Sequence, residues 1–372
     1  MIYLDNAATS LLKPAAVGQA MTAALRTMAS PGRGGHSPAM LAAETVYNCR
    51  SEAAELFGLT EPEHVVFTMN ATHALNIAIF SLTAPGTRVL ISGFEHNSVT
   101  RALHAAGAKL SIAGRKLFDA EDTLADFARQ IDTAELVVCT HVSNAFGYIL
   151  PIEDIAALCR QRGIPLIVDA SQSAGVLPVD AAALGAAFVA MPGHKGLFGP
   201  QGTGLLLCAQ EGRPLLHGGS GSESRLQEMP RELPDRLEAG THNVCGIAGL
   251  LAGLQYVREQ STEQILQKDR KLLRRLVDGL QDTELELFVG PEERQCGVLS
   301  VRSPRHDCGE LAQRLAERGI CVRSGLHCAP TAHESAGTLE TGTLRFSVSP
   351  FVTEEQIDRA CRLIRGTLAA SS

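Results

Sequence analysis

The stretch Phe188-Val189-Ala190-Met191-Pro192-Gly193-His194-Lys195-Gly196 decides the fold and indicates the chemistry. It runs from apolar residues, typical of a buried strand, directly into a glycine-rich turn that carries a lysine. Glycines on both sides of the His194-Lys195 pair allow a bulky planar ligand to approach the backbone. A lysine presented in this way is suited to forming a Schiff base, whereas a solvent-exposed lysine on a turn is the commoner interpretation of such a residue taken alone.

Similar short runs of β-branched or aliphatic residues recur through the first two thirds of the chain. Segments with helical spacing, such as residues 72–82 and 152–162, separate them. The alternation of strand and helix predicts an α/β fold with a mostly parallel sheet covered on both faces. The predicted strands are Val65–Phe67, Val89–Ile91, Leu136–Val138, Leu166–Val168, Phe188–Ala190 and Gly204–Leu207.

The rest of the chain has a different pattern. We expect a large α/β domain over residues 15–250 and a smaller α+β domain formed by residues 1–14 and 251–372. A proline- and charge-rich stretch, 213–234, predicts a long surface loop, and apolar spacing over 246–281 predicts a long helix. In the small domain, strands are expected at 298–301, 321–323 and 343–348, and helices at 309–318 and from Glu354 onward.

Composition excludes several classes of protein. The 372 residues hold 33 Lys+Arg against 40 Asp+Glu, a net charge of −7, and no long basic block, which argues against direct nucleic-acid or membrane-surface binding. No apolar run is long enough to span a bilayer. None of the ten cysteines forms a C-x-x-C pair, so we expect no metal site. With no secretory signal recognised, reduced thiols and a cytoplasmic location are expected.

Two further motifs place polar groups near predicted strand ends. Asp169 follows the run Leu166–Val168, at the edge where a doubly wound sheet binds its ligands, and a carboxylate there can hold a pyridinium proton. Capping of a following helix is an equally good interpretation of Asp169 alone. Asn70-Ala71-Thr72-His73 opens a predicted helix whose first amides could bind a phosphate, although ordinary capping by Asn70 or Thr72 is the simpler interpretation.

Together these motifs resemble those of fold-type I pyridoxal phosphate (PLP) enzymes of the class V aminotransferase group, most closely cysteine desulfurases and selenocysteine lyases. The resemblance covers nearly the whole chain and implies a seven-stranded, mostly parallel sheet in the large domain. Its nine elements, in order, are Tyr3–Thr9, Ala71-Thr72, Glu95-His96-Asn97, Thr140–Asn144, Asp169–Gln172, Gly193-His194-Lys195, Glu238–Thr241, Arg323–Cys328 and Thr343–Ser347.

The resemblance implies a role for each matching residue. Lys195 would carry the cofactor, Asp169 would pair with the pyridine nitrogen, and His96 would stack on the ring. Arg345 would bind the substrate carboxylate, with Asn144 and Arg323 as further substrate contacts. The remaining implied cofactor contacts are Asn144 and Gln172 at the ring hydroxyl, and Ala71, Thr72, His194 and, from the partner subunit of a homodimer, Thr241 at the phosphate. Pro192 stands where the desulfurases usually carry a hydroxyl residue that helps to bind the phosphate.

Cys328 is the residue that distinguishes among the possible functions of this fold. It lies between Arg323 and a loop that ends at Gly342, so it is expected to be exposed and close to positive charge, conditions that favour a reactive thiolate. Most other cysteines lie in apolar segments and are expected to be buried. The resemblance implies conversion of L-cysteine to L-alanine, a persulfide on Cys328 and a protein that accepts the sulfur. The alternatives are a selenocysteine lyase, a class V lyase or aminotransferase in which Cys328 has no role, and a non-enzymatic protein on a degenerate scaffold.

Overall fold

The computed structural model describes residues 1–31 and 34–369 and is built on a seven-stranded sheet. The strand order is β2-β8-β7-β6-β5-β3-β4, and β8 is the single antiparallel strand, since it pairs in that sense with both β2 and β7. The expected α/β class with a mostly parallel sheet is therefore confirmed. The strands are β2 (Val65–Thr68), β3 (Arg88–Ser92), β4 (Lys109–Ala113), β5 (Leu136–Thr140), β6 (Leu166–Asp169), β7 (Phe188–Pro192) and β8 (Gly204–Cys208).

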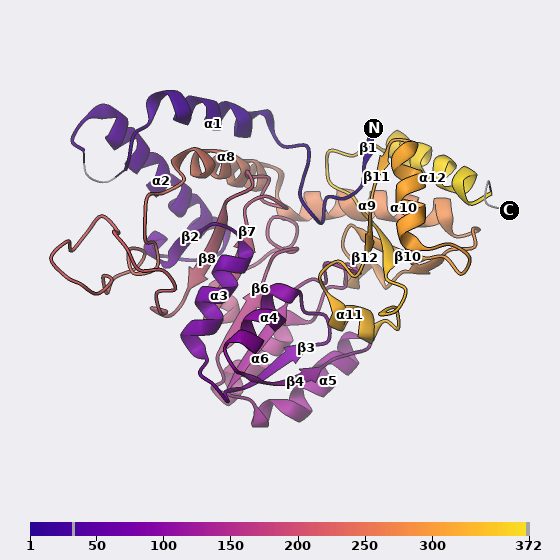
Figure 1. The fold of residues 1–372 in the computed structure, drawn as a ribbon, viewed down its shortest axis with the longest axis horizontal. Helices are drawn as coiled ribbons and strands as arrows, with labels where there is room; N and C mark the ends of the chain where they lie inside the picture. The colour runs from indigo at the N-terminus through magenta and orange to yellow at the C-terminus, as the bar shows by residue number, and fades with distance from the viewer. Residues whose placement is uncertain (32–33, 370–372) are drawn as a thin grey trace.

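Helices cover both faces of this sheet (Figure 1). One face packs on α3 (Ala71–Leu82) and α4 (Asn97–Ala105), and the apolar side chains between these layers form one core cluster. A second cluster lies on the opposite face. The helices that contribute to it include α2 (Ser37–Leu56), α5 (Ala120–Gln130), α6 (Ile152–Arg162), the short α7 (Ala181–Leu184) and α8 (Val244–Gln260). Helix α1 (Ala15–Thr27) lies beside α8 on the outside.

The C-terminal part forms a second core around a four-stranded sheet of order β12-β13-β10-β9. The N-terminal strand β1 (Ile2–Tyr3) joins this part by pairing with β11 (Ile320–Cys321). The other elements are α9 (Thr262–Leu280), β9 (Glu286–Phe288), β10 (Val298–Arg302), α10 (Cys308–Glu317), β12 (Arg323–Gly325), α11 (Pro330–Ser335), β13 (Thr343–Ser347) and α12 (Glu354–Ala369).

Several features differ from the pattern predicted residue by residue. The strand expected at 321–323 is divided between two strands, β11, which ends at Cys321, and β12, which begins at Arg323. Strand β4 was not among the runs, because it lies at the sheet edge with Lys109 and Ser111 exposed. The long helix expected over 246–281 is two helices that separate at Ser261, a residue with φ of 61°. The residues before Gly342 were expected as a loop but include α11. The stretch 213–234 contains neither helix nor strand, as predicted.

Among the described residues, no helix is both long and apolar enough to cross a membrane.

Candidate active site

A cavity of about 210 Å³ opens at the carboxyl ends of the parallel strands, where β5, β6 and β7 end at Thr140, Asp169 and Pro192. Side chains from the N-terminal segment and from the C-terminal part close its other sides. We call it the Lys195 cavity. Of the predicted site residues it brings together Ala71, Thr72, His96, Asn144, Asp169, Gln172, His194, Lys195, Arg323, Cys328 and Arg345.

Lys195 follows β7 directly and is half-buried in the cavity. Burial lowers the pKa of Lys195 to about 8, although the nearby carboxylate of Asp169 acts in the opposite direction. No side-chain acceptor among the described residues forms an ion pair or hydrogen bond with Nζ. A lysine that loses its proton near neutral pH and has no fixed partner can act as a nucleophile or a base.

The glycines around Lys195 are explained by packing within the protein. A Cβ on Gly193 would lie 2.1 Å from Thr203 Oγ1, and a Cβ on Gly196 would lie 2.4 Å from the carbonyl oxygen of Ala174. Both separations are far below van der Waals contact. The sequence predicts that these glycines let a ligand approach the backbone, whereas in the structure they allow a close approach of the chain to itself.

Asp169 is the last residue of β6 and is 2% exposed. Its Oδ1 accepts a hydrogen bond from the amide of Ser171 at 2.9 Å. No helix begins there, because the next helix, α7, starts at Ala181, so the alternative of a helix cap is wrong. The carboxylate therefore lines the cavity as a buried acid at a strand end.

Two histidines of the cavity are held as neutral rings. His96 caps α4, and its Nδ1 accepts from the amide of Ser98 at 3.0 Å, while burial lowers the pKa of His96 to about 4. His194 Nδ1 lies 3.0 Å from Thr9 Oγ1, and burial again lowers the pKa to about 4. Because neither ring carries a charge near neutral pH, His96 offers the cavity an uncharged aromatic surface.

The first turn of α3 also faces the cavity. Asn70 caps this helix, since its Oδ1 accepts from the amide of His73 at 2.9 Å, so the capping interpretation of Asn70 is confirmed. Ala71 and Thr72 line the Lys195 cavity, and Thr72 Oγ1 lies 2.8 Å from Ser98 Oγ. The amino end of a helix with two hydroxyl groups beside it is a suitable environment for a phosphate.

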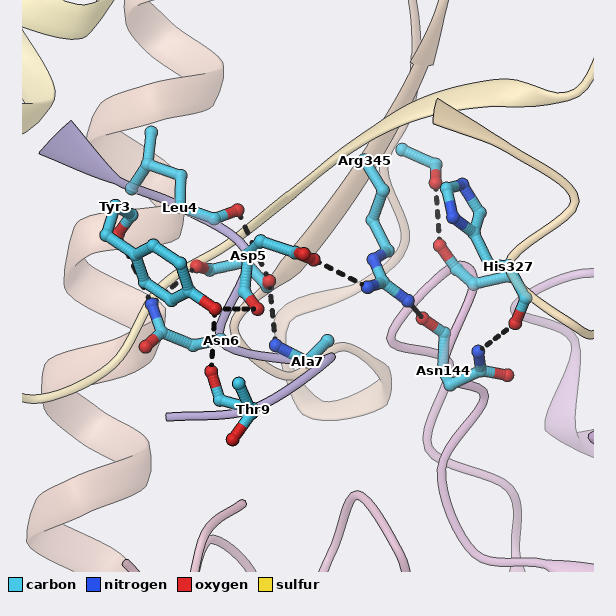
Figure 2. Close-up of polar contacts among 12 residues, drawn as sticks. Tyr3, Leu4, Asp5, Asn6, Ala7, Thr9, Asn144, His327 and Arg345 are labelled. Atoms are coloured by element: carbon cyan, nitrogen blue, oxygen red, sulfur yellow. Dashed lines mark hydrogen bonds and ion pairs between the residues drawn. The ribbon is translucent and has the colours of Figure 1, made fainter. Parts of the chain in front are cut away.

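Arg345 lies in the middle of β13, and its side chain is 1% exposed (Figure 2). Its Nη1 donates to the carbonyl oxygen of Asn144 and its Nη2 to Asp5 Oδ1, each at 2.8 Å. Asn144 in turn donates from Nδ2 to the carbonyl oxygen of His327 at 2.7 Å. Arg345 Nε and Asn144 Oδ1 are buried polar atoms without a hydrogen-bond partner among the described residues.

Cys328 is the one exposed cysteine, whereas Cys139, Cys159, Cys208 and Cys361 are buried as expected. It shares the Lys195 cavity, and its carbonyl oxygen accepts from the amide of Asn97 at 2.7 Å. Cys328 and the buried His327 both have positive φ, 58° and 50°, a backbone conformation that side chains other than glycine rarely adopt. His327 Nε2 lies 3.0 Å from Thr343 Oγ1, which ties the turn to β13.

Gln172 and Thr241 differ from the other predicted residues. Gln172 lines the cavity, but its Nε2 donates to the carbonyl oxygen of Ala7 at 3.0 Å, so that group serves the N-terminal segment. Thr241 is exposed and lies outside the Lys195 cavity, in a second cavity with Phe67 and His73. Within one chain the structure therefore does not bring Thr241 to Lys195.

Several contacts of the cavity residues could not be predicted from the sequence. Among them are Asp5 with Arg345, Ser98 with Thr72, and the amide of Ser171 with Asp169. Asp5 belongs to the motif Tyr3–Thr9, which was recognised without a role for any member. Ser98 and Ser171 each lie two residues from a predicted site residue, and this proximity was the only signal available for them.

Comparison with known proteins agrees with this geometry. The model of the aminotransferase class-V family matches residues 2–360. The chain is 33% identical to a probable cysteine desulfurase of Pyrococcus abyssi, covering 96% of this chain and 92% of that protein. A probable cysteine desulfurase of Xylella fastidiosa is also 33% identical, over 96% of this chain and 89% of the relative.

A solved structure is similar over almost the same extent. The apo structure of a cysteine desulfurase from Thermococcus onnurineus NA1 superimposes with a TM-score of 0.91 at 31% identity, covering 99% of this chain and 95% of that chain. The family match, the relatives and the fold all confirm the resemblance that the sequence motifs indicated. The chain belongs to the class V aminotransferase family, in which its relatives are named cysteine desulfurases.

Proposed function

We propose that the protein is a PLP-dependent cysteine desulfurase that converts L-cysteine to L-alanine and retains the sulfur as a persulfide on Cys328. One observation carries this proposal: the exposed thiol of Cys328 lines the same cavity as the amine of Lys195, which has no side-chain partner among the described residues. The names of the relatives support the same activity.

The residues of the cavity fit the cofactor. Lys195 Nζ has no side-chain partner in the described part of the chain, and Asn144 Oδ1 is a buried acceptor left without a donor. Lys195 would hold the cofactor covalently, Asp169 would face its ring nitrogen, and the first turn of α3 would face its phosphate. When bound, PLP supplies an electron sink that weakens the bonds at the substrate α-carbon.

The surrounding residues would complete the cofactor site. His96 would present its neutral ring to the cofactor, and Gln172 and Asn144 would lie on its hydroxyl side. Ala71, Thr72 and His194 would bind the phosphate, and Pro192 contributes no backbone N–H donor there. Thr241 is exposed on the same chain and is free to reach the phosphate of a second copy, so we propose a homodimer.

Substrate binding is assigned to the positive groups of the cavity. Arg345 presents a planar guanidinium that can bind the substrate carboxylate with two hydrogen bonds, and Asn144 holds its orientation through the hydrogen bond from Nη1. Arg323 lies exposed at the same cavity and adds positive charge for an anionic substrate.

Proton and sulfur transfer are assigned to two side chains. Lys195, with its pKa lowered by burial, takes the proton from the substrate α-carbon and returns it at the end of the reaction. The Cys328 thiolate attacks the substrate sulfur, so that a sulfur–sulfur bond forms while the carbon–sulfur bond breaks and its electron pair stays with the carbon fragment. That fragment gains protons and leaves as L-alanine. A protein thiol then accepts the persulfide sulfur, and we place this transfer in the cytoplasm.

Mass spectrometry after addition of L-cysteine tests the proposal. We expect one extra sulfur on the fragment that contains Cys328, and Cys328→Ala should abolish both the extra sulfur and L-alanine formation. Cys321→Ala, a half-buried cysteine in β11, is the matched control and should keep both. Unchanged L-alanine formation by Cys328→Ala would remove the persulfide step, and activity of that variant on L-selenocysteine alone would indicate a selenocysteine lyase.

A further inference from the structure

Arg345 is paired with an acid of its own chain. Nη2 donates to Asp5 Oδ1 at 2.8 Å, and the side chain of Arg345 is 1% exposed while that of Asp5 is 20% exposed. Burial lowers the pKa of Arg345, and the hydrogen bond to Asp5 counteracts this effect. A guanidinium buried to this extent needs a counter-charge, and in the ligand-free protein Asp5 supplies it.

Backbone pairing determines the position of Asp5. Residues 4–6 run beside the end of β13: the amide of Ser347 donates to the carbonyl oxygen of Leu4 at 2.7 Å, and Asn6 Nδ2 donates to the carbonyl oxygen of Ser347 at 3.0 Å. Ser347 is two residues from Arg345 on the same strand. Asp5 is thus held next to the guanidinium by contacts that do not involve its own carboxylate.

Asp5 accepts its hydrogen bond from Arg345 Nη2, and the choice of this nitrogen matters for the binding of a second carboxylate. A guanidinium binds a carboxylate with two hydrogen bonds through either the Nη1/Nη2 edge or the Nε/Nη2 edge, and Nη2 belongs to both. In this structure Nη2 donates to Asp5 and Nη1 donates to the carbonyl oxygen of Asn144, while Nε has no partner among the described residues. A second carboxylate bound in this way must therefore share Nη2 with Asp5 or replace it.

We propose that Asp5 is an internal competitor of the substrate carboxylate at Arg345 and thereby sets the affinity for the amino-acid substrate. This inference rests on the proposed function, in which Arg345 binds that carboxylate. Two carboxylates at one guanidinium repel each other, so the charge of Asp5 weakens substrate binding. When no substrate is bound, the same negative charge balances the positive charge of the buried Arg345. Asp5 therefore acts on the substrate only through Arg345, as a positioning residue.

Substitution of the charge alone tests the inference. Asp5→Asn keeps an acceptor for Nη2 and removes the negative charge. In the cofactor-loaded protein, we expect sodium propionate, a carboxylate without an amino group, to bind about tenfold more tightly to Asp5→Asn than to the wild type in ligand-detected NMR titrations. The KM for L-cysteine should fall by a similar factor while kcat stays within about twofold. A residue that only stabilises the fold would not change KM in this direction.

Control variants separate the possible outcomes. Asp358→Asn removes one acid from the exposed Arg275–Asp358 ion pair, which does not line the Lys195 cavity, and should leave propionate affinity unchanged. Arg345→Gln should lose propionate binding. If Arg345→Gln binds propionate like the wild type, the proposed carboxylate site itself is wrong. If Arg345→Gln loses binding and folded Asp5→Asn shows equal or weaker affinity, the competition is refuted and the proposed function stands. Asp5→Ser, neutral and smaller, decides the question if Asp5→Asn does not fold.

Discussion

Asn144 joins Arg345 to the turn that carries Cys328, because it donates a hydrogen bond of 2.7 Å from Nδ2 to the carbonyl oxygen of His327, the residue before Cys328. Its own carbonyl oxygen accepts from Arg345 Nη1 at 2.8 Å. Asn144, in the segment that follows β5, thus contacts Arg345 and the residue that precedes Cys328. Since His327 and Cys328 have positive φ, the turn needs such contacts to keep its conformation.

We expect Asn144→Ala to release the cysteine turn. The rate of persulfide formation on Cys328 should fall by about tenfold or more, because the thiol is no longer held at the cavity. Alkylation of Cys328 by iodoacetamide, followed by mass spectrometry of its peptide, should become faster. Gln313→Ala, an exposed position on α10, is the control and should alter neither rate. Equal alkylation of Asn144→Ala and wild type would show that this hydrogen bond does not restrain the turn.

Most residues of the Lys195 cavity could be predicted from the sequence, because they lie in local patterns that mark the ends of strands and the start of a helix. Lys195, Asp169 and Ala71 lie at the ends of strands or the start of a helix, and in a parallel sheet these ends meet at one edge. The local context of Cys328 indicated an exposed thiol, but the placement of Cys328 and Arg345 at this cavity came only from the family resemblance, since no local pattern places a distant strand over the sheet edge.

The contacts within the cavity could not be predicted in the same way. The pairing of Asp5 with Arg345 depends on how residues 4–6 run beside β13, a contact between the two ends of the chain. Edge strand β4 was missed because its exposed positions carry Lys109 and Ser111, which remove the apolar signal of a buried strand. The break at Ser261 requires a positive φ that the helical spacing on both sides does not indicate.

The lowered pKa of Lys195, about 8, predicts how cofactor uptake depends on pH. The neutral amine is the nucleophile, so the rate at which cofactor-free protein binds PLP should rise with pH with a midpoint near 8 and level off about one unit above it. A normal lysine would give a rise that continues beyond pH 10. Stopped-flow absorbance measures the rate, and Lys195→Ala should show no covalent phase while the exposed control Lys109→Ala matches the wild type. A midpoint near 10 would contradict the effect of burial.

We expect the buried Glu95 to make a pH-dependent contribution to the free energy of unfolding. It is fully buried next to His96, and burial raises the pKa of Glu95 to about 8 even though its Oε1 accepts from the amide of Thr140 at 2.8 Å. The folded protein therefore keeps a proton that the unfolded chain loses near pH 4 to 5. The stability that protonation of Glu95 contributes is fully present below pH 4 to 5 and is lost as the pH rises towards 8.

We expect Glu95→Gln to remove this loss, because glutamine resembles the protonated acid and can accept the same hydrogen bonds. Relative to the wild type, the free energy of unfolding of Glu95→Gln should be similar near pH 4.5 and higher by about 4 kcal/mol near pH 8. Denaturant unfolding at the two pH values measures it. Glu286→Gln, an exposed partner of Arg302, should show no such difference between the two pH values. A constant gap between wild type and Glu95→Gln would mean that Glu95 is charged in the folded protein.

Because Thr241 is exposed, we expect two inactive variants to restore activity when they are combined in one dimer. Thr241 lies outside the Lys195 cavity of its own chain, so under the proposed homodimer Thr241→Arg should damage the site of the partner and leave its own site intact. Lys195→Ala inactivates its own site and still offers a normal Thr241. Co-expression of the two variants should therefore form mixed dimers with one complete site and restore part of the L-alanine formation, whereas each variant alone should be nearly inactive. Because Thr241→Ser keeps the hydroxyl, it should retain cofactor affinity. Mixed dimers without restored activity would show that Thr241 does not act across the interface.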